Sequence, residues 1–516
     1  MPSSNVNWNY IFTIGVIACG SIPKGYDEGG FSSATGLASF RSDFGLNASD
    51  WGDDTVGLAN RKANISSFGV LGAAIGSILV AATCDRLGRL RTWQLSMIWW
   101  MTGNLLQTFS SGILGLMLFA RIWGGLGAGG LTVVTPLYLS EIAPARSRGA
   151  VTSVYMVVLL TFLSIGFFIS FGAGEGLPDT RVQYRLVVAI VLVPTGLALL
   201  LSFFLNDTPK WLAAEDRVED AVSVLSKLRG GNNGHAVALE IQELQQSMRE
   251  KQKALDGVTS WQIIKEIATI RTFRMRLLFG VAVQTIAQWS GGNGITYYIP
   301  TIFEYAGVKG SDTSLITSGA YGIVKLVFVM IFTWVLVDNV GRRKCSLGGL
   351  FLQFIAHVYL AIYMALFMSG TNKHASDAAI AAVFVYAVGW SIGLCTIPFV
   401  YSTEIYPTRI RGVCVSINMV LHWFFQFAVV RVTPNLFAAL DVWGAYVFWA
   451  SICFVGLIVL GLWAPETKGV HMDQIEDLFE GPWYTTWKAK PRRESLERMI
   501  DPPEKTWVIE ERSERV

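Results

Sequence analysis

The stretch Glu-Ile-Ala-Pro-Ala-Arg-Ser-Arg-Gly at residues 141–149 decides the fold, because a close copy of it returns later in the chain. Residues 404–412 read Glu-Ile-Tyr-Pro-Thr-Arg-Ile-Arg-Gly. Three pairs of motifs recurring in the same order indicate an internal repeat, with two copies of one structural unit. The other two pairs are Asp-Arg-Leu-Gly-Arg at 85–89 with Asp-Asn-Val-Gly-Arg-Arg at 338–343, and Asp-Thr-Pro-Lys at 207–210 with Pro-Glu-Thr-Lys at 465–468.

Each of these motifs follows a long apolar run. Hydrophobic residues make up 52 % of the 516 positions and charged residues only 15 %, against about 25 % charged residues in a soluble domain. One membrane-spanning helix needs about 20 apolar residues. We therefore predict an all-α membrane protein rather than a disordered chain, a nucleic-acid binder or a secreted disulfide scaffold. Its twelve apolar runs are 9–30, 65–83, 92–110, 113–137, 150–173, 184–205, 275–304, 314–337, 346–368, 378–402, 412–434 and 443–463.

The repeat divides these runs into two groups of six. We predict twelve transmembrane helices in two pseudo-symmetric six-helix halves, at residues 1–205 and 273–464. A polar linker at 206–272 joins the halves, and its apolar residues recur at helical spacing. Residues 465–516 form a charged tail.

Arginine and lysine predict the orientation, because they concentrate in cytoplasmic loops. The loops that carry the repeated motifs and the linker are rich in these residues, and most loops on the opposite side have few or none. Both termini and the linker should therefore be cytoplasmic, in a multi-pass protein of the plasma membrane. Asn47-Ala48-Ser49 falls in the first outer loop and matches a glycosylation sequon; an acceptor and a chance match are equally consistent with it.

The motifs together resemble the sugar porter family of the major facilitator superfamily, and the sequence texture is similar to that of fungal members. The likeness runs from Gly25-Tyr26-Asp27 to Pro465-Glu466-Thr467-Lys468-Gly469. It implies the fold of that superfamily and transport by alternating access, with the substrate held between the halves. One departure is Ala81, which stands where the first family motif usually has glycine.

Charged residues of the repeated motifs are gating candidates. Ion pairs that form only when the cytoplasmic side is closed would favour the outward-open state. Positive-inside anchoring and helix capping are the alternative explanation for any one residue. The gating candidates are Asp85, Arg89, Glu141, Arg148, Asp338, Arg342, Glu404 and Arg411.

Asp27 and Arg121 are charged residues within apolar runs. Ionisable residues in a membrane are costly and usually face a bundle interior or a water-filled cavity. An aspartate that alternates between protonation and pairing with an arginine couples transport to a proton, and proton symporters of the resembled family use such a pair at these places. A static ion pair is the alternative. Glu28 is expected to point elsewhere and is assigned no role.

The substrate site is predicted from the seventh, eighth, tenth and eleventh runs. Residues 288–298 resemble the family motif Q-Q-x-x-G-x-N-x-x-x-Y-Y, although its first glutamine is Ala287 here. Amides and phenols suit sugars, because they both donate and accept hydrogen bonds; interhelical contacts are the alternative role. The substrate-binding candidates are Gln288, Asn293, Tyr297, Tyr298, Lys325, Phe399, His422, Trp423 and Gln426.

Two departures from the family pattern change the expected substrate. Met156 occupies the place of a sugar-binding glutamine, and Lys325 that of an asparagine. A lysine in mid-span must be paired or functional, so Lys325 either compensates an anionic substrate, pairs with a carboxylate or extends to the membrane surface. Some fungal relatives that resemble quinate permeases have a similar lysine. A plain glucose carrier is therefore less favoured.

We predict a secondary active transporter and no enzyme. The predicted activity is proton-coupled uptake of a monosaccharide, a sugar acid or a quinate-like hydroxy acid. Facilitated diffusion, a transporter-like nutrient sensor and a metabolite exporter are the alternatives. The expected partners are a small-molecule substrate and the lipid bilayer, with no nucleic acid, no metal and no cofactor besides a coupling proton, and the protein should function as a monomer.

Overall fold

The computed structural model is built from helices. It describes residues 7–144, 147–230, 237–242, 244–246, 249, 260–308, 311–368, 372–468, 470, 472–475 and 477–489, and no strand occurs among them. Arg146 of the quoted motif and most of the predicted tail lie outside this described part.

The first half of the chain follows the predicted runs closely. Its first span is irregular, because a 3-10 turn at Cys19–Ser21 and a π-helical turn at Asp27–Phe31 separate its α-helical pieces. The helices are α1 (Trp8–Ala18), α2 (Ile22–Tyr26), α3 (Ser32–Ala34), α4 (Ala38–Asp43), α5 (Thr55–Leu87), α6 (Arg89–Thr108), α7 (Leu114–Ile142), α8 (Arg148–Gly176), α9 (Arg181–Ala189) and α10 (Leu192–Ser202).

The described residues of the linker and of the second half form helices as well. In the linker lie α11 (Pro209–Ala214), α12 (Val218–Arg229) and α14 (Ser260–Thr269). The second half comprises α15 (Arg271–Trp289), α16 (Gly292–Tyr297), α17 (Ile299–Tyr305), α18 (Ser311–Ile331), α19 (Val337–Asn339), α20 (Arg342–Leu366), α21 (Lys373–Gly393), α22 (Ile397–Glu404), α23 (Thr408–Ala439) and α24 (Asp441–Trp463). A π-helical turn at Phe332–Leu336 joins α18 to α19.

Nine helices in the described residues are long and apolar enough to cross a membrane. The other three predicted spans are also helical. The first and seventh are interrupted, at residues 19–21 and 290–291, and α6 carries more polar side chains than the rest. The structure thus confirms a multi-helix membrane fold, and the count of twelve spans stays a prediction.

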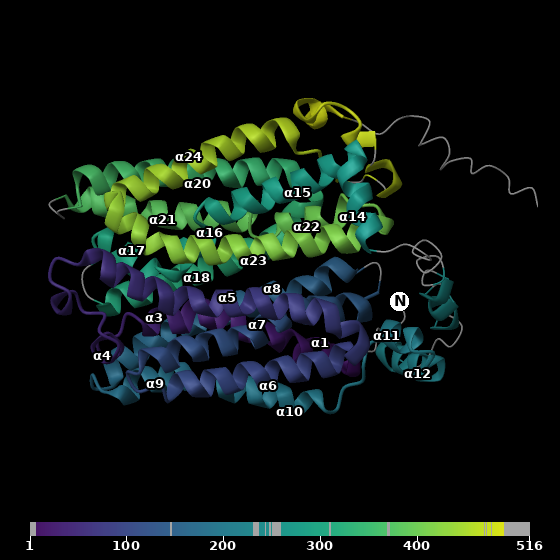
Figure 1. Cartoon of the computed structure of the whole chain (residues 1–516), viewed down its shortest axis with the longest axis horizontal. Helices are drawn as coiled ribbons and strands as arrows, with labels where there is room; N and C mark the ends of the chain where they lie inside the picture. Colours follow the sequence, from purple (N-terminus) through teal and green to yellow (C-terminus); the bar gives the residue numbers. More distant parts are fainter. Residues whose placement is uncertain are drawn as a thin grey trace, which may run out of the picture.

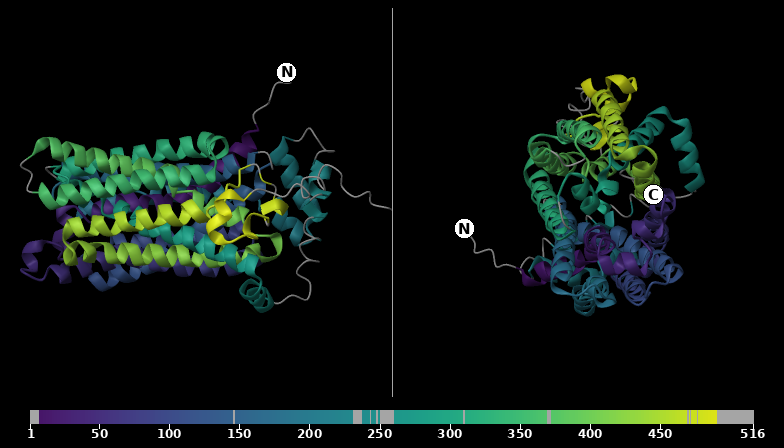
Figure 2. Two further views of the ribbon diagram at one scale, coloured as in Figure 1. Left: turned by 90° about the horizontal axis from the view of Figure 1, so that it is seen from above. Right: turned by 90° about the vertical axis from the view of Figure 1, so that its left-hand side faces the viewer.

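The two halves lie side by side as two bundles, with the helices of both nearly parallel (Figure 1). Viewed along these helices, residues up to α10 form one bundle and residues from α15 onward form the other (Figure 2). The linker helices α11 and α12 lie at one end of the molecule, which we call the linker end. Helix α4 lies at the other, the α4 end.

The two copies of the sequence repeat also share a backbone conformation at one glycine. Gly88 precedes α6 with φ 89° and ψ 156°, and Gly341 precedes α20 with φ 100° and ψ 158°. This region of backbone space is open almost only to glycine. The same sharp turn therefore starts the third helix of each half, which explains why both motifs contain glycine.

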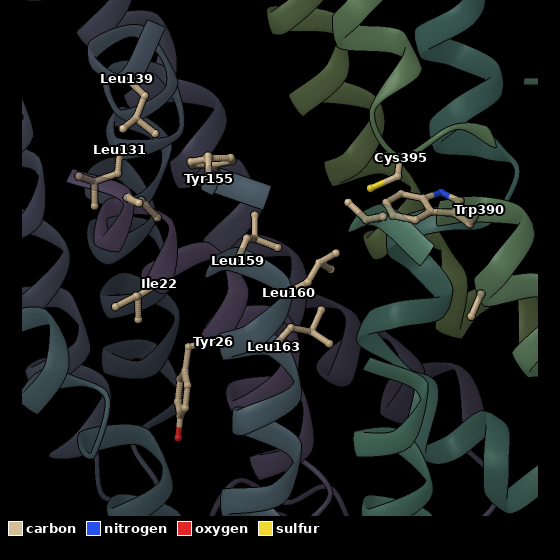
Figure 3. Close-up of a cluster of buried hydrophobic side chains, with 14 of the residues drawn as sticks. Ile22, Tyr26, Leu131, Leu139, Tyr155, Leu159, Leu160, Leu163, Trp390 and Cys395 are labelled. Carbon is tan, nitrogen blue, oxygen red and sulfur yellow. The ribbon is translucent and has the colours of Figure 1, made fainter. Parts of the chain in front are cut away.

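Small residues bring the helices of the first half close together. A Cβ atom at Gly129 of α7 would collide with the backbone of Ala73 in α5, and one at Gly25 would collide with Leu159 of α8. These glycines therefore allow backbone-to-backbone packing. Between the halves, Leu160 and Leu163 of α8 belong to the same buried cluster as Trp390 and Cys395 (Figure 3).

Candidate functional site

Asp27 and Arg121 form an ion pair in the middle of the first half. Both terminal nitrogens of Arg121 donate to the Asp27 carboxylate, while its Nε donates to the carbonyl oxygen of Ile65 at 3.0 Å. The guanidinium carbon also lies 3.9 Å from the centre of the Phe31 ring. Arg121 is thus fixed on several sides, and Asp27, with a side chain 20 % exposed, is the more accessible partner.

Tyr297 connects this pair to the second half. Its hydroxyl donates to Oδ2 of Asp27 at 2.8 Å, across the interface between the halves. It is the last residue of α16, the helix that starts after the chain breaks at Gly291, whose φ of 97° suits glycine. A residue predicted to bind substrate therefore also contacts the predicted proton site. The neighbouring Tyr298 donates to the carbonyl oxygen of Val430 at 3.2 Å.

Three of the predicted substrate residues form one hydrogen-bonded network. Asn293 donates to Gln288 at 3.0 Å, and the Gln288 amide lies 3.0 Å from Nδ1 of His422. Gln284, which the sequence reasoning missed, completes the network at 3.0 Å from the same nitrogen. Its position one helical turn before Gln288 is the signal that could have identified it.

Gln426 follows His422 by one helical turn on α23 and has an amide without a partner in the described part of the structure. It is fully buried, yet neither its amide nitrogen nor its amide oxygen has a hydrogen-bond partner among the described residues. Buried polar groups are normally satisfied, so Gln426 offers hydrogen-bonding capacity that water or a polar ligand can use. The predicted aromatic residues lie near the network: the ring centres of Phe399 and Trp423 are 5.1 and 5.7 Å from that of His422.

Lys325 is 1 % exposed and points into the second half. Its ammonium donates to Thr296 at 3.1 Å and lies 4.3 Å from the centre of the Trp390 ring. No carboxylate of the described residues is within ion-pair distance of it. Two of the three explanations for this lysine, a direct carboxylate partner and extension to the membrane surface, therefore do not fit the structure.

The indole nitrogen of Trp390 is a further buried donor without a partner in the described part of the chain. It faces the break between α15 and α16, because a Cβ atom at Gly292 would collide with it. The sequence reasoning missed Trp390 because a tryptophan in an apolar run is indistinguishable from a packing residue.

Glu28, which is expected to point elsewhere than Asp27, has a charged partner of its own. It is buried and forms an ion pair with Lys24 at 2.8 Å, whereas Asp27 pairs with Arg121. Residues 27–31 form a π-helical turn at this place. Two charges at a spacing of four residues inside an apolar run were the signal for this pair.

Two cavities lie along the interface between the halves. A cavity of about 30 Å³ is bounded by Lys24, Asp27, Arg121, Tyr297 and Trp423, among others. A larger cavity of about 330 Å³ lies toward the α4 end, and its lining includes Tyr297, Tyr298 and residues of both halves. Tyr297 borders both cavities.

The gating candidates form two matching clusters at the linker end. Arg89 pairs with Glu141 at 3.1 Å and with Asp85 at 2.9 Å. In the second half, Arg342 pairs with Glu404 at 3.0 Å.

Threonines complete both clusters. Thr208 donates to Glu141 and Thr467 donates to Glu404, each at 2.6 Å. In the described part of the chain, the ion pairs of these clusters join residues of the same half.

The remaining gating candidates are placed differently. Arg148 is exposed and forms no ion pair within the described residues. Arg411 donates to the carbonyl oxygen of Tyr406 at 3.0 and 2.9 Å. The side chain of Asp338 lies outside the described part of the structure.

Comparison with known proteins gives a consistent set of relatives. The sequence profile described as "Sugar (and other) transporter" matches residues 13–479. A probable quinate permease of Aspergillus flavus is 31 % identical, over 96 % of this chain and 94 % of the relative. A quinate permease of Neurospora africana is 28 % identical, over 93 % and 90 %.

Solved structures show the same fold. The proton:xylose symporter XylE bound to 6-bromo-6-deoxy-D-glucose aligns with a TM-score of 0.74 and 20 % identity, over 92 % of this chain and 100 % of that one. The inward-open conformation of XylE from E. coli aligns with a TM-score of 0.73 and 20 % identity, over 91 % and 100 %. At this level of identity the likeness establishes the fold.

Proposed function

The chain belongs to the sugar (and other) transporter family, and from that premise we propose that it carries a quinate-like hydroxy acid across a membrane in symport with a proton. The protein is a multi-pass membrane transporter and not an enzyme. To the family and the transporter class, the proposal adds two points: the substrate is an anion, and the coupling ion is a proton.

Lys325 is the observation on which the charge of the substrate rests. A buried ammonium is costly unless a counter-charge is present, and the described residues supply only hydrogen-bond and aromatic contacts within reach of it. A substrate carboxylate would provide the missing counter-charge. The names of the quinate permeases among the relatives agree with this.

The hydroxyl groups of the substrate have candidate partners in the polar network. Gln288, Asn293 and His422 already interact with one another, and Gln426 and Trp390 have unused hydrogen-bonding capacity among the described residues. A ring with several hydroxyls and one carboxylate would use both the network and Lys325. The Asp27–Arg121 pair is the proposed coupling site, because Asp27 can accept a proton without disturbing the other contacts of Arg121.

We further propose uptake across the plasma membrane, with the linker end in the cytoplasm and the monomer as the functional unit. The arginines of the two gating clusters support this orientation, because they all lie at the linker end. No cofactor besides the proton enters the proposal.

Uptake of labelled quinate and labelled glucose, in a host that lacks quinate uptake, tests the proposed function. We expect accumulation of quinate that an uncoupler abolishes. Lys325→Met should lower quinate uptake at least tenfold, because the counter-charge for the carboxylate is lost. The control is Lys373→Met, which removes an exposed lysine at the start of α21. Normal quinate uptake by Lys325→Met, or uptake of glucose alone by the wild type, would refute the proposal.

A further inference from the structure

The pair formed by Lys24 and Glu28 has no assigned role, although it lies in the centre of the molecule. The side chains are 12 % and 5 % exposed, and the pair belongs to the first membrane span. Burying two charges costs about as much as their attraction returns, so apolar residues of similar size would serve packing equally well. A buried ion pair at this place therefore needs a functional explanation.

The surroundings of Lys24 identify it as part of a binding surface. Its ammonium lies 4.8 Å from the ring centre of Trp423 and 6.0 Å from that of Tyr297, both in the second half. It also borders the cavity of about 30 Å³ next to Asp27. That volume holds about one or two water molecules, far less than a sugar acid. A ligand can therefore enter only if side chains that line the cavity move.

Charge at the centre is unbalanced. Lys24, Arg121 and Lys325 supply three positive charges, and Asp27 and Glu28 supply two negative ones. The carboxylate of Glu28 contacts Lys24 and that of Asp27 contacts Arg121, which leaves Lys325 without a carboxylate partner among the described residues. An anionic ligand would restore the balance.

We propose that Glu28 is a built-in counter-ion that occupies Lys24 while the site is empty, and that the carboxylate of the substrate takes its place. This inference rests on the proposed anionic substrate. In this exchange Lys24 is a second cation that binds the substrate carboxylate, besides Lys325. The exchange also explains selectivity, since a neutral sugar has no group that can replace Glu28.

Binding to the purified full-length protein tests this inference independently of transport. Quinate and its neutral methyl ester share the same hydroxyls and differ in charge, and ligand-induced thermal stabilisation measures the Kd of each. Glu28→Gln should bind quinate at least fivefold more tightly, because the internal competitor is gone. Lys24→Gln should bind quinate at least tenfold more weakly. The Kd of the ester should change less than twofold in both variants.

A double variant guards against loss of folding. Lys24→Gln combined with Glu28→Gln removes both charges of the pair together, so that neither member is left buried without the other. Compared with Lys24→Gln alone, the double variant should show no gain in quinate affinity, since the cation for which the two carboxylates compete is absent. Arg217→Gln, which breaks an exposed pair with Asp220 in the linker, is the control and should leave the ratio of the two Kd values unchanged.

Equal changes in the Kd of quinate and in the Kd of the ester in these variants would overturn the inference, because they would indicate a purely structural pair. Weaker quinate binding by Glu28→Gln would also overturn it. If the wild type does not distinguish quinate from the ester, the anionic substrate and the exchange both fail. If it does distinguish them but the Lys24 and Glu28 variants do not differ from it, only the exchange fails.

Discussion

Asp27 is the residue through which protonation would reach the interface between the halves. Its carboxylate accepts from Arg121 within the first half and from Tyr297 of the second half. Protonation would remove the charge that both donors share and weaken both contacts together. The charge of the Asp27 carboxylate is thus linked to its contact with Tyr297, which must change when the halves move.

Replacing Asp27 by asparagine is expected to separate transport from accumulation. Asp27→Asn keeps the size of the side chain and removes the titrating group, so quinate should exchange across the membrane without accumulating against its gradient. Counterflow of labelled quinate and uncoupler-sensitive uptake measure the two properties. Asp43→Asn, which weakens an ion pair with Arg181 at the α4 end, is the control. Accumulation by Asp27→Asn that still responds to the uncoupler would exclude Asp27 as the coupling site.

At the scale of helices, two carboxylates fix the third helix of each half. Asp207 accepts from the backbone N–H groups of Arg89 and Leu90, each at 3.1 Å. Glu466 accepts from those of Arg342 and Arg343 at 2.9 and 3.2 Å. The first N–H groups of a helix have no partner within it, so these acidic residues cap α6 and α20 from a distant part of the sequence.

Removing the cap on α6 should lower stability measurably. Asp207→Ala leaves the two N–H groups of α6 without their acceptor and should cost about 1 kcal/mol, seen as a lower melting temperature in detergent. Asp207→Asn keeps an acceptor oxygen and should cost less. Asp85→Ala is the control, because that side chain is 79 % exposed and its ion pair with Arg89 contributes little. Equal melting temperatures for Asp207→Ala and the wild type would contradict the capping role.

The same residue gives a pH dependence. Burial is the main influence on Asp207 and raises the pKa of its carboxyl above the ordinary value of 3.8, although three backbone N–H groups oppose the shift. The folded protein therefore binds this proton more tightly than the unfolded chain, and this contribution to stability falls as the pH rises from 3.8 through the raised pKa. Relative to Asp207→Asn, the wild type should gain stability on acidification; a difference that does not vary with pH would be inconsistent with the shift.

The sequence predicted the features that depend on a local pattern of residues. It did not predict the contacts between segments that are distant in the chain. The apolar runs predicted the helices, and Gly291 and Gly292 coincide with the break after α15. Asp27 and Arg121 were recognisable because charges are rare in such runs. The surroundings of Lys325 were not, since Thr296 and Trp390 come from other helices and have no local signature.

For the whole molecule, the direct polar contacts between the halves are unevenly placed. Within the described residues, Tyr297 contacts Asp27 at the centre, while Arg431 and Asn435 of α23 donate to Asn60 of α5 at 3.0 and 3.2 Å toward the α4 end. At the linker end the clusters form within each half. Separation of the α4 ends must therefore break the contacts of Asn60, whereas the linker-end clusters can move with their own halves.

A cross-link at the α4 end should consequently stop transport. Cysteines at Asn60 and Asn435, joined by a short bifunctional thiol reagent, would hold α5 against α23 and prevent the halves from separating at that end. Uptake should be lost in the treated double variant and retained in each treated single variant. The control joins Asp43→Cys to Arg181→Cys, which lie together within the first half and should tolerate the reagent. If transport continues after complete cross-linking of positions 60 and 435, the α4 ends do not separate during the cycle, and the substrate must then reach the 330 Å³ cavity by movement of local side chains alone.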